Sequence, residues 1–417
     1  MESLKKNFNI KIVNFIFATF IFFWDQNILS IDIRFLIILL IPLYFFVEEN
    51  KNFKIRIKEL YIFIFLNLFV FVHFFLNDLF LNGYFYKNLN ALIGFFLISV
   101  ISFLFKNYFI ENLESIIKQF ILIFFIYFLI ELIFFKEFYS LNNFDCLNAW
   151  LNVKNTDFNL FTESSHFGMM APAVVTFILF KSNNSLSEKF LSYLVIFFLF
   201  LFLSTTFLIG LIISLLFISL TSLRKIKNSK KLLLIFIILF SFIVVMSNKQ
   251  CNMRFNETLG ISLINLKSFY YKNKDIKKEY TNSLENGSLN ISSEVFSNSI
   301  TIAIKSFKSN PLGLGVNNYY QAHKKYSEQF LSGSHFLNKQ DASNNLSKII
   351  VEFGVFSLVF FFLIVKFSLK SSIDLPNKSF LLSIIITQLI RGAGYFNGGF
   401  LLCILIIFLY SLNEENA

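Results

Sequence analysis

Long apolar runs follow one another along almost the whole chain of 417 residues. A helix that spans a bilayer needs about 20 mostly apolar residues, and about twelve segments approach that length. Because a chain in lipid must satisfy its backbone hydrogen bonds internally, the pattern predicts an all-α, polytopic transmembrane bundle of about twelve spans. The expected spans lie near residues 9–24, 33–47, 60–77, 89–105, 117–135, 166–181, 190–204, 205–222, 231–246, 346–366, 378–391 and 399–412.

Composition agrees with this class. The chain is 56% hydrophobic and 15% charged, whereas soluble domains carry about 25% charged residues. The net charge of +11 would suggest nucleic acid binding in a soluble protein. Here the basic residues lie mainly in short segments between apolar runs, so membrane topology explains them better and no nucleic acid partner is expected.

The distribution of Lys and Arg sets the expected orientation, because short cytoplasmic loops are enriched in them. Both termini are expected in the cytoplasm, and the segment 247–345 is expected on the outer side. The opposite, outer short loops hold only Arg34, Lys87, Lys136, Lys154 and Arg391. The basic side holds Lys5, Lys6, Lys11, Lys51, Lys54, Arg56, Lys58, Lys106, Lys118, Lys181, Lys189, Arg224, Lys225, Lys227, Lys230, Lys231, Lys366, Lys370 and Lys378.

Three parts follow from this pattern. Residues 1–246 would form spans 1–9, residues 247–345 one large outer loop between spans 9 and 10, and residues 346–417 spans 10–12 with a cytoplasmic C-terminus. Within the loop, apolar spacing predicts an amphipathic helix on the membrane surface near 261–278 and a second helix around 300–307. The Asn- and Ser-rich stretch 281–299 between them is expected to be an excursion without regular structure.

No motif for a metal or a nucleotide is present. Cys146 and Cys251 fall in expected outer loops, where they could pair or remain two free thiols, and Cys403 lies in the last span. Because Cys-x-x-Cys, His-Glu-x-x-His, Walker and dinucleotide motifs are missing, no metal or cofactor is expected. An ATP-driven pump and a zinc protease are thereby disfavoured.

A glycine turn stands near the end of the outer loop, in the phrase Asn-Pro-Leu-Gly-Leu-Gly that ends at Gly315. Gly313 and Gly315 permit positive φ and close approach of the backbone. Such a turn, continuing to Asn317, can direct amide groups at an anionic oxygen. The simpler alternative is a tight turn that only redirects the chain.

Ionisable residues at the outer ends of spans are the other candidates, because charges in lipid are costly and usually face a cavity or the bundle interior. Arg391 ends the eleventh span, and Glu163 stands at the mouth of the sixth. Lys348 and Glu352 share one helix face, which favours a structural ion pair. His323 and His335 in the outer loop lie close to Asp341 and the glycine turn, so either is a candidate general base.

Four segments together resemble a known family. The turn at 310–315 resembles the loop signature of bacterial O-antigen polymerases and the related O-antigen ligases, and residues 341–356 resemble the helix that follows it. Residues 161–168 resemble the Glu-Pro-Ser entry to a middle span, with Ser164 in place of Pro. Residues 204–211 resemble the Ser-Arg-Thr helix start, with Thr205 in place of Arg.

The resemblance implies a bacterial inner-membrane glycosyltransferase with a periplasmic loop. Its substrates would be oligosaccharide repeat units on undecaprenyl diphosphate; a chain-length regulator and a flippase are further possible partners. A sugar hydroxyl of one unit attacks the other chain, and polyprenyl diphosphate leaves. The cation for the diphosphate would be Arg391, then Arg254, with Lys305 and Lys308 in reserve. The glycine turn with Gly313, Gly315 and Asn317 would bind substrate, and the base would be His335, then Glu163, then His323.

Two departures favour the polymerase over the ligase. Many ligases carry an Arg upstream of the glycine turn, where this chain has Glu294, Val295 and Phe296. Ligases also tend to have His-Asn where this chain has Asn344-Asn345. A lipid-linked glycan flippase or other transporter remains a rival of another class, although transporters place ionisable residues near mid-membrane, where these spans are apolar. A scaffold of an envelope assembly complex is the third alternative.

Overall fold

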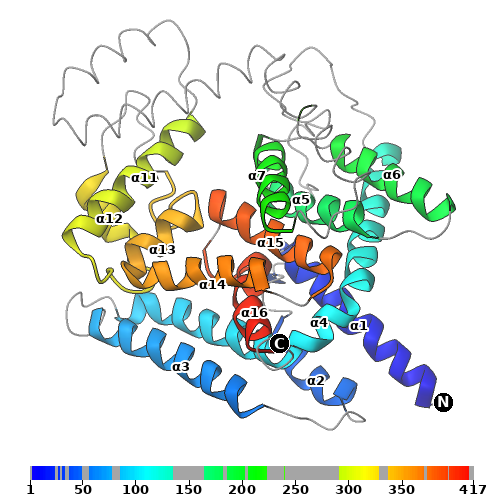
Figure 1. The fold of residues 1–417 in the computed structure, drawn as a ribbon, viewed down its shortest axis with the longest axis horizontal. Coiled ribbons are helices and arrows are strands. Elements are labelled where there is room, and N and C mark those ends of the chain that lie inside the picture. Colours follow the sequence, from blue (N-terminus) through cyan, green and yellow to red (C-terminus); the bar gives the residue numbers. More distant parts are fainter. Residues whose placement is uncertain are drawn as a thin grey trace, which may run out of the picture.

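The computed structural model is all-helical apart from one antiparallel pairing of two-residue strands, β1 (Asn27–Ile28) and β2 (Ile31–Asp32). Thirteen helices are formed by the residues that the structure describes (Figure 1). Those residues are 2–23, 27–28, 31–32, 37–48, 56–77, 85–134, 164–181, 186–201, 205–222, 239, 291–327, 337–370, 373–392 and 394–412.

The helices before residue 223 are α1 (Glu2–Phe22), α2 (Leu40–Glu48), α3 (Ile57–Phe74), α4 (Phe85–Phe134), α5 (Ser164–Phe180), α6 (Leu186–Leu201) and α7 (Thr205–Ser222). Those after residue 290 are α11 (Ile291–Ser309), α12 (Tyr319–Tyr326), α13 (Asn345–Phe353), α14 (Phe356–Lys370), α15 (Leu375–Ile390) and α16 (Gly398–Leu412). The expected span at 231–246 and the expected surface helix at 261–278 lie outside the described helices.

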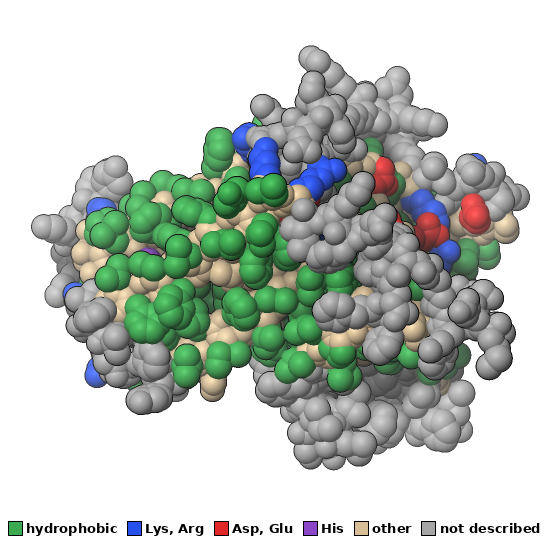
Figure 2. Space-filling model, turned by 90° about the horizontal axis from the view of Figure 1, so that it is seen from below, with side chains coloured by type: hydrophobic (Ala, Val, Ile, Leu, Met, Phe, Trp, Pro, Cys, Tyr) green, Lys and Arg blue, Asp and Glu red, His purple; other side chains and the backbone are tan. Residues whose placement is uncertain are grey.

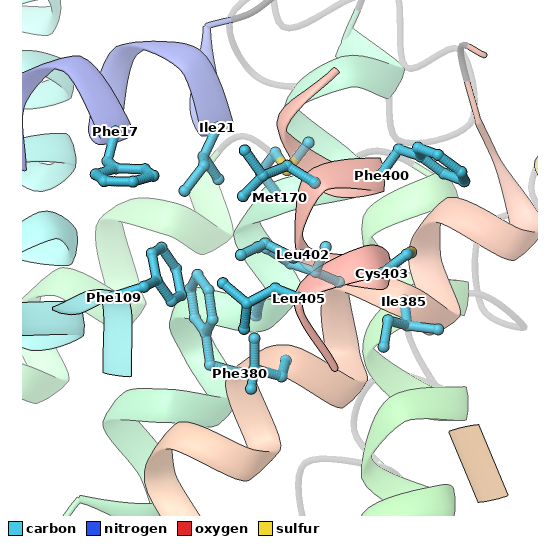
Figure 3. Packing of buried hydrophobic residues seen from close by; sticks show 14 of the residues in the cluster. Phe17, Ile21, Phe109, Met170, Phe380, Ile385, Phe400, Leu402, Cys403 and Leu405 are labelled. Carbon is cyan, nitrogen blue, oxygen red and sulfur yellow. The ribbon is translucent and has the colours of Figure 1, made fainter. Parts of the chain in front are cut away.

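The main core lies where α15 and α16 pack against the N-terminal helices. Phe17, Phe109, Phe380 and Leu405 are all fully buried there (Figure 3). Small groups bring α7 close to α15, since a Cβ added at Gly210 would lie 2.6 Å from the Thr387 side chain. These contacts bury the last two helices from all sides, as their continuous apolar sequence requires.

Helix α4 joins two spans that the sequence analysis separates. One 50-residue helix covers 89–105, 117–135 up to Phe134, and the basic segment between them. Such a helix is about 75 Å long if straight, against a hydrocarbon core of about 30 Å. Its first part packs on α3 through Phe63 and Phe103, and its last part on α5 through Phe124 and Phe167 (Figure 1). The expected loop at 106–116 is therefore wrong, because these residues are helical.

The expected span 346–366 is instead two helices. Helix α13 stops at Gly354, which has a φ of 55°, and α14 begins two residues later. Its ψ of −129° places Gly354 in a region that glycine adopts far more readily than other residues. The break turns α13 into a separate short helix, and its C-terminal end meets the glycine turn.

Residues 291–327 and 337–353 share a second, smaller core made by Ile302, Ala303, Tyr319, Ala322, Ala342 and Val351. The helix expected around 300–307 is confirmed as part of α11. The irregular excursion expected at 281–299 is wrong for residues 291–299, since α11 begins at Ile291 and Ser297, Asn298 and Ser299 are buried. Small polar residues here pack against neighbours rather than solvent.

A broad apolar surface lies on the side of the molecule where α3 runs (Figure 2). Helices covering Ile57–Asn77 and Asn88–Ile126 are long and apolar enough to cross a membrane, and only 22% of the first stretch is buried. Large side chains exposed there include Tyr61 and Phe65 at 69% and 72%. Water-soluble monomers rarely expose contiguous apolar patches above a few hundred Å².

Polar contacts gather at two ends of this apolar bundle. At one end, Lys106 pairs with Glu59, and Lys181 with Glu114. Here the starts of α1, α3 and α15 meet the middle of α4. At the other end, the last turn of α3 and the first turn of α4 meet the glycine turn through His73 and Asn88. The residues singled out by sequence lie mostly at this second end.

Candidate functional site

The glycine turn and the end of α13 are built against each other. A Cβ at Gly313 would lie 2.3 Å from the carbonyl oxygen of Glu352, and one at Gly354 would lie 2.1 Å from that of Pro311. Gly313 and Gly315 have φ of 90° and 95°. Only glycine combines these torsions with so close an approach, so the double glycine serves to dock the turn onto the helix.

The amides of this turn are already used within the chain. Leu314 and Gly315 donate to the carbonyls of Val351 and Glu352, both at 3.0 Å. They satisfy carbonyls that the end of α13 would otherwise leave without a partner. The expectation that these glycine amides receive a substrate anion is therefore not supported by the geometry, and the simpler alternative of a structural turn fits better.

The backbone after the turn does hold an anion, and it is an internal one. The Tyr319 amide donates to Oε1 of Glu352 over 3.3 Å, and the Glu352 side chain is 0% exposed. Asn317, with φ of 61°, fixes the same segment by donating from Nδ2 to Oδ1 of Asn88 over 3.1 Å. Asn88 in turn donates to Oδ1 of Asn318 over 2.9 Å. The predicted binding residue Asn317 thus joins the outer segment to α4.

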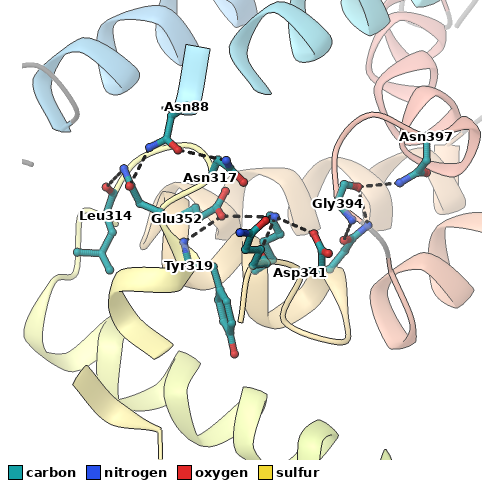
Figure 4. A network of polar contacts seen from close by, with 12 residues as sticks. Asn88, Leu314, Asn317, Tyr319, Asp341, Glu352, Gly394 and Asn397 are labelled. Atoms are coloured by element: carbon teal, nitrogen blue, oxygen red, sulfur yellow. Dashed lines mark hydrogen bonds and ion pairs between the residues drawn. The ribbon is translucent and has the colours of Figure 1, made fainter. Parts of the chain in front are cut away.

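Lys348 stands between two carboxylates. Its Nζ lies 3.9 Å from Oε1 of Glu352 and 3.6 Å from Oδ1 of Asp341 (Figure 4). The ammonium also donates to the Gln340 carbonyl over 2.8 Å and lies 5.2 Å from the centre of the Tyr395 ring. The expected Lys348–Glu352 ion pair is present, but Lys348 shares its charge with a second acid at the surface.

The row of three charges runs from interior to solvent. Side-chain exposure is 0% for Glu352, 3% for Lys348 and 58% for Asp341. A buried charge needs a partner to offset its lost hydration, and Lys348 serves both ends of the row. The only acid of the three that a dissolved or lipid-borne group can reach is Asp341.

The segment from Asp341 to Asn345 holds strained backbone. Ala342 and Ser343 have φ of 60° and 65° and are buried. This left-handed conformation costs L-residues about 1–2 kcal/mol each, and it persists only where surrounding contacts fix it. Asn344 and Asn345 follow as the cap and first residue of α13.

Contacts to separate elements fix this segment. Asn344 Oδ1 accepts from the Ser347 amide over 2.8 Å, as a helix cap does, and its Nδ2 donates to Ser299 Oγ on α11 over 2.6 Å. Asn345 Nδ2 donates to Gln388 on α15 over 3.3 Å, and Asn345 Oδ1 accepts from the amide of Gly394 over 3.2 Å. The segment is therefore a clamp that ties α11, α13 and α15 together.

Arg391 joins the same segment from the end of α15. Its Nη1 donates to Oγ of Ser343 over 3.0 Å, and the residue is half-buried. Nearby, the backbone of Gly394 passes close to the charge row, since a Cβ there would lie 3.6 Å from Asp341 Oδ1 and 3.9 Å from Lys348 Nζ. The predicted cation Arg391 and the row of charges therefore border one stretch of chain.

Other predicted residues lie elsewhere in the described structure. His323 on α12 is 5% exposed and its ring lies 6.2 Å from that of Tyr319. Burial, followed by the Glu352 carboxylate, raises the pKa of the Tyr319 hydroxyl, so this phenol stays protonated. Lys305 is half-buried and Lys308 exposed, both on α11. The second core around His323 makes it a poor candidate for direct contact with a large substrate.

Several predicted residues lie outside the described residues. These are Glu163, Arg254 and His335, together with the possible cysteine pair Cys146 and Cys251. Cys403 is a buried free thiol. Nowhere in the described ranges do three or more His, Cys, Asp or Glu side chains gather in a group that could hold a metal ion.

Sequence reasoning missed the shared role of Lys348, the exposed position of Asp341 and the contribution of Gln388. The signal for Asp341 was available in the run Asp-Ala-Ser-Asn-Asn before α13, because short polar residues favour caps and unusual torsions. Chemically, the arrangement offers a half-buried guanidinium, an exposed carboxylate and a rigid backbone between them. Comparison with family models, with curated proteins and with solved structures finds no match for this chain.

Proposed function

We propose that this chain is a multi-pass membrane glycosyltransferase that joins lipid-linked oligosaccharide units, as O-antigen polymerases do. The donor would be a glycan on undecaprenyl diphosphate, and polyprenyl diphosphate would leave. Energy for the bond comes from this leaving group, so the reaction as proposed uses no ATP. The proposal rests on the four segments that resemble the family. It also rests on the polar cluster around Asp341, Lys348 and Arg391, which lies near them.

The positions of helix ends support the proposed topology. Contacts place Asn14 of α1, Glu59 of α3 and Lys181 after α5 at one polar end. Glu59 and Lys181 belong to the ends predicted to be cytoplasmic, whereas Asn14 lies in the middle of α1. The opposite end holds His73 of α3 and Arg391 after α15, from ends predicted to be periplasmic. We propose that this second end faces the periplasm of a bacterial inner membrane, with both termini in the cytoplasm.

One observation carries the chemical part of the proposal, and it is the position of Arg391. Arg391 is half-buried and donates to Ser343 at the end of the bundle that we propose to be periplasmic, where it would meet the diphosphate of an isoprenoid lipid. A guanidinium keeps its charge and binds phosphate oxygens in a fixed fork. Such a group stabilises the charge that develops on a leaving diphosphate.

The test is transfer by the full-length protein in nanodiscs. Undecaprenyl-diphosphate-linked repeat units from cells that lack this chain serve as donor and acceptor, without ATP or an ion gradient. Wild-type protein is expected to produce a ladder of longer glycans, and Arg391→Ala is expected to lose about 2–4 kcal/mol of transition-state stabilisation, or 30- to 1,000-fold in rate. Lys118→Ala is the matched control, because that lysine is a 70% exposed cation at the other polar end.

A ligase is the second candidate, favoured by the same motifs. Deletion in cells separates the two: a lost polymerase leaves lipid A–core bearing a single repeat, whereas a lost ligase leaves bare core and accumulated lipid-linked polymer. A transporter predicts no glycan ladder from purified protein. A scaffold predicts that Arg391→Ala retains full function in cells.

A further inference from the structure

We infer that Asp341 is the proton acceptor of the proposed transfer, held in place by Lys348. The inference rests on the proposed function and adds a catalytic residue to it. The three residues proposed as base from sequence do not include Asp341. Its case comes from exposure, ion pairing and backbone strain at one position.

Accessibility separates Asp341 from the other described acids of the cluster. Its side chain is 58% exposed, whereas that of Glu352 is 0% exposed. A general base has to come within hydrogen-bond reach of the hydroxyl that it deprotonates. Glu352 cannot meet a glycan without unfolding α13, and Asp341 can do so as it stands.

Lys348 fixes the position of the Asp341 side chain. Lys348 Nζ lies 3.6 Å from its Oδ1, and Lys348 is itself held by the Gln340 carbonyl and by Glu352. The contact with Lys348 fixes the direction of the Asp341 carboxylate, in the way that a third group orients the base of a nucleophile–base pair. Among the described residues, Lys348 is a charged group in contact with Asp341, and Lys348 in turn contacts Glu352 and the Tyr395 ring.

Strain beside Asp341 gives the second independent observation. Two consecutive buried residues, Ala342 and Ser343, adopt φ near that of a left-handed helix. Such outliers persist at sites where a geometry is required for function. Here the strained pair sets Asp341 on one side of the segment and the Arg391 anchor at Ser343 on the other. Base and diphosphate cation are thus spaced by one rigid piece of backbone.

Gly394 passes close to the Asp341 carboxylate and the Lys348 ammonium. A Cβ at Gly394 would lie 3.6 Å from Asp341 Oδ1, so the link from α15 to α16 passes the carboxylate without a side chain between them. Its φ of 88° belongs to the region that glycine favours. The approach of an acceptor hydroxyl to Asp341 is inferred from the 58% exposure of its side chain.

The step balances as follows. The hydroxyl oxygen of the acceptor bonds to the anomeric carbon of the donor while the bond from that carbon to the diphosphate oxygen breaks. The electron pair of the broken bond leaves on polyprenyl diphosphate beside Arg391. The hydroxyl proton passes to the Asp341 carboxylate, which then releases it to water.

Asp341→Asn and Asp341→Ala test the inference in the nanodisc transfer assay. A general base contributes about 10²–10⁴-fold, so Asp341→Asn is expected to lower kcat by at least about 100-fold with little change in KM. Asp341→Ala, which opens space at an exposed site, is expected to regain rate with added formate or acetate in a concentration-dependent way. The control is Asp374→Asn, an exposed acid before α15 that makes no cap hydrogen bond, and it is expected to match wild type.

The outcomes distinguish the two proposals. Wild-type protein that makes no product would overturn the proposed function and this inference with it. Active wild type with an equally active Asp341→Asn would overturn the inference alone. A slow Asp341→Ala that small carboxylic acids do not rescue, with lowered thermal stability in detergent, would make Asp341 structural and likewise overturn it.

Discussion

Among the residues that the structure describes, a buried Lys–Glu ion pair lies at each polar end of the bundle. The two pairs differ in what surrounds the lysine. Lys106 lies 3.0 Å from Glu59, donates to the Phe103 carbonyl and lies over the Phe103 ring. Both side chains are almost fully buried, at 9% and 3% exposure. Lys348 lies farther from Glu352, at 3.9 Å, and divides its charge with exposed Asp341. The Lys106 ammonium is enclosed between two helices. The Lys348 ammonium, in contrast, also contacts an acid at the surface.

Under the proposed function, the difference indicates how one chain can use Lys–Glu pairs for stability at one end and for support of a site at the other. A closed pair needs only to offset the desolvation of its two charges. A shared cation beside strained backbone costs stability, and such cost is typical of functional sites. Strain occurs around Lys348 at Ala342 and Ser343, whereas Lys106 lies within the regular helix α4.

Lys348→Met is expected to have the largest effect on stability at the end of the bundle where Lys348 contacts Asp341. It leaves Glu352 buried without its cation, and breaking a buried pair in this way costs about 3–5 kcal/mol of unfolding free energy. Equilibrium unfolding in mixed micelles measures this loss, and transfer in nanodiscs should fall with it.

The double variant Lys348→Met/Glu352→Gln sharpens that comparison. Removing both charges of a buried pair is often neutral, so the double variant should regain most of the stability. It should not regain transfer, because Asp341 has lost its holder. Recovery of both properties would make the Lys348–Glu352 pair as structural as the Lys106–Glu59 pair.

Lys106→Met should destabilise by a similar mechanism, and it is the direct counterpart. The single substitution leaves Glu59 buried without its cation, which again costs about 3–5 kcal/mol of unfolding free energy. Here the double variant Lys106→Met/Glu59→Gln is expected to restore stability and transfer together. A double variant that is stable yet inactive would assign function to this end as well and would erase the contrast.

Gly354→Ala probes the docking of the glycine turn. The added Cβ would lie 2.1 Å from the Pro311 carbonyl oxygen at a φ of 55°, so either the turn or the end of α13 must move. Overpacking of this kind costs about 1–3 kcal/mol, measured as a lower denaturation midpoint.

Gly94→Ala is the matched control, since its Cβ would meet the Phe396 ring at 3.3 Å and that side chain can shift. Equal stability of the two variants would contradict close docking of the turn.

The helices were largely predictable because apolar length and periodicity are properties of the local sequence. The spacing of Ile300, Ala303, Ile304 and Phe307 correctly indicated α11. The wrong prediction of a loop at 106–116 has a physical cause. A charged segment between two apolar runs has the composition of a loop. In the structure, Lys106 forms an ion pair with Glu59 on another helix, and the segment remains helical. The count of about twelve spans and the outer loop stay predictions.

The site was predictable only where one residue suffices to signal chemistry. Arg391 was selected from the sequence because a charge at the end of a span is costly in lipid and usually faces a cavity or the bundle interior. Glu352 was predicted as the partner of Lys348, but its contact with the Tyr319 amide and the contact of Lys348 with Asp341 depend on the fold and were not predicted. The glycine turn was recognised, but its amides were assigned to a ligand when they bind α13.

The smallest predicted effect separates strain from bonding at Ser343. Ser343→Ala removes the acceptor of the Arg391 hydrogen bond and keeps the left-handed backbone, whereas Ser343→Gly removes both the bond and the strain. Because a left-handed L-residue costs about 1–2 kcal/mol, the Gly variant should be more stable than the Ala variant by about 1 kcal/mol. Transfer should fall to the same extent in both, since each removes the Arg391–Ser343 hydrogen bond. An Ala variant as stable as the Gly variant would mean that Ser343 stores no strain at this end of the bundle.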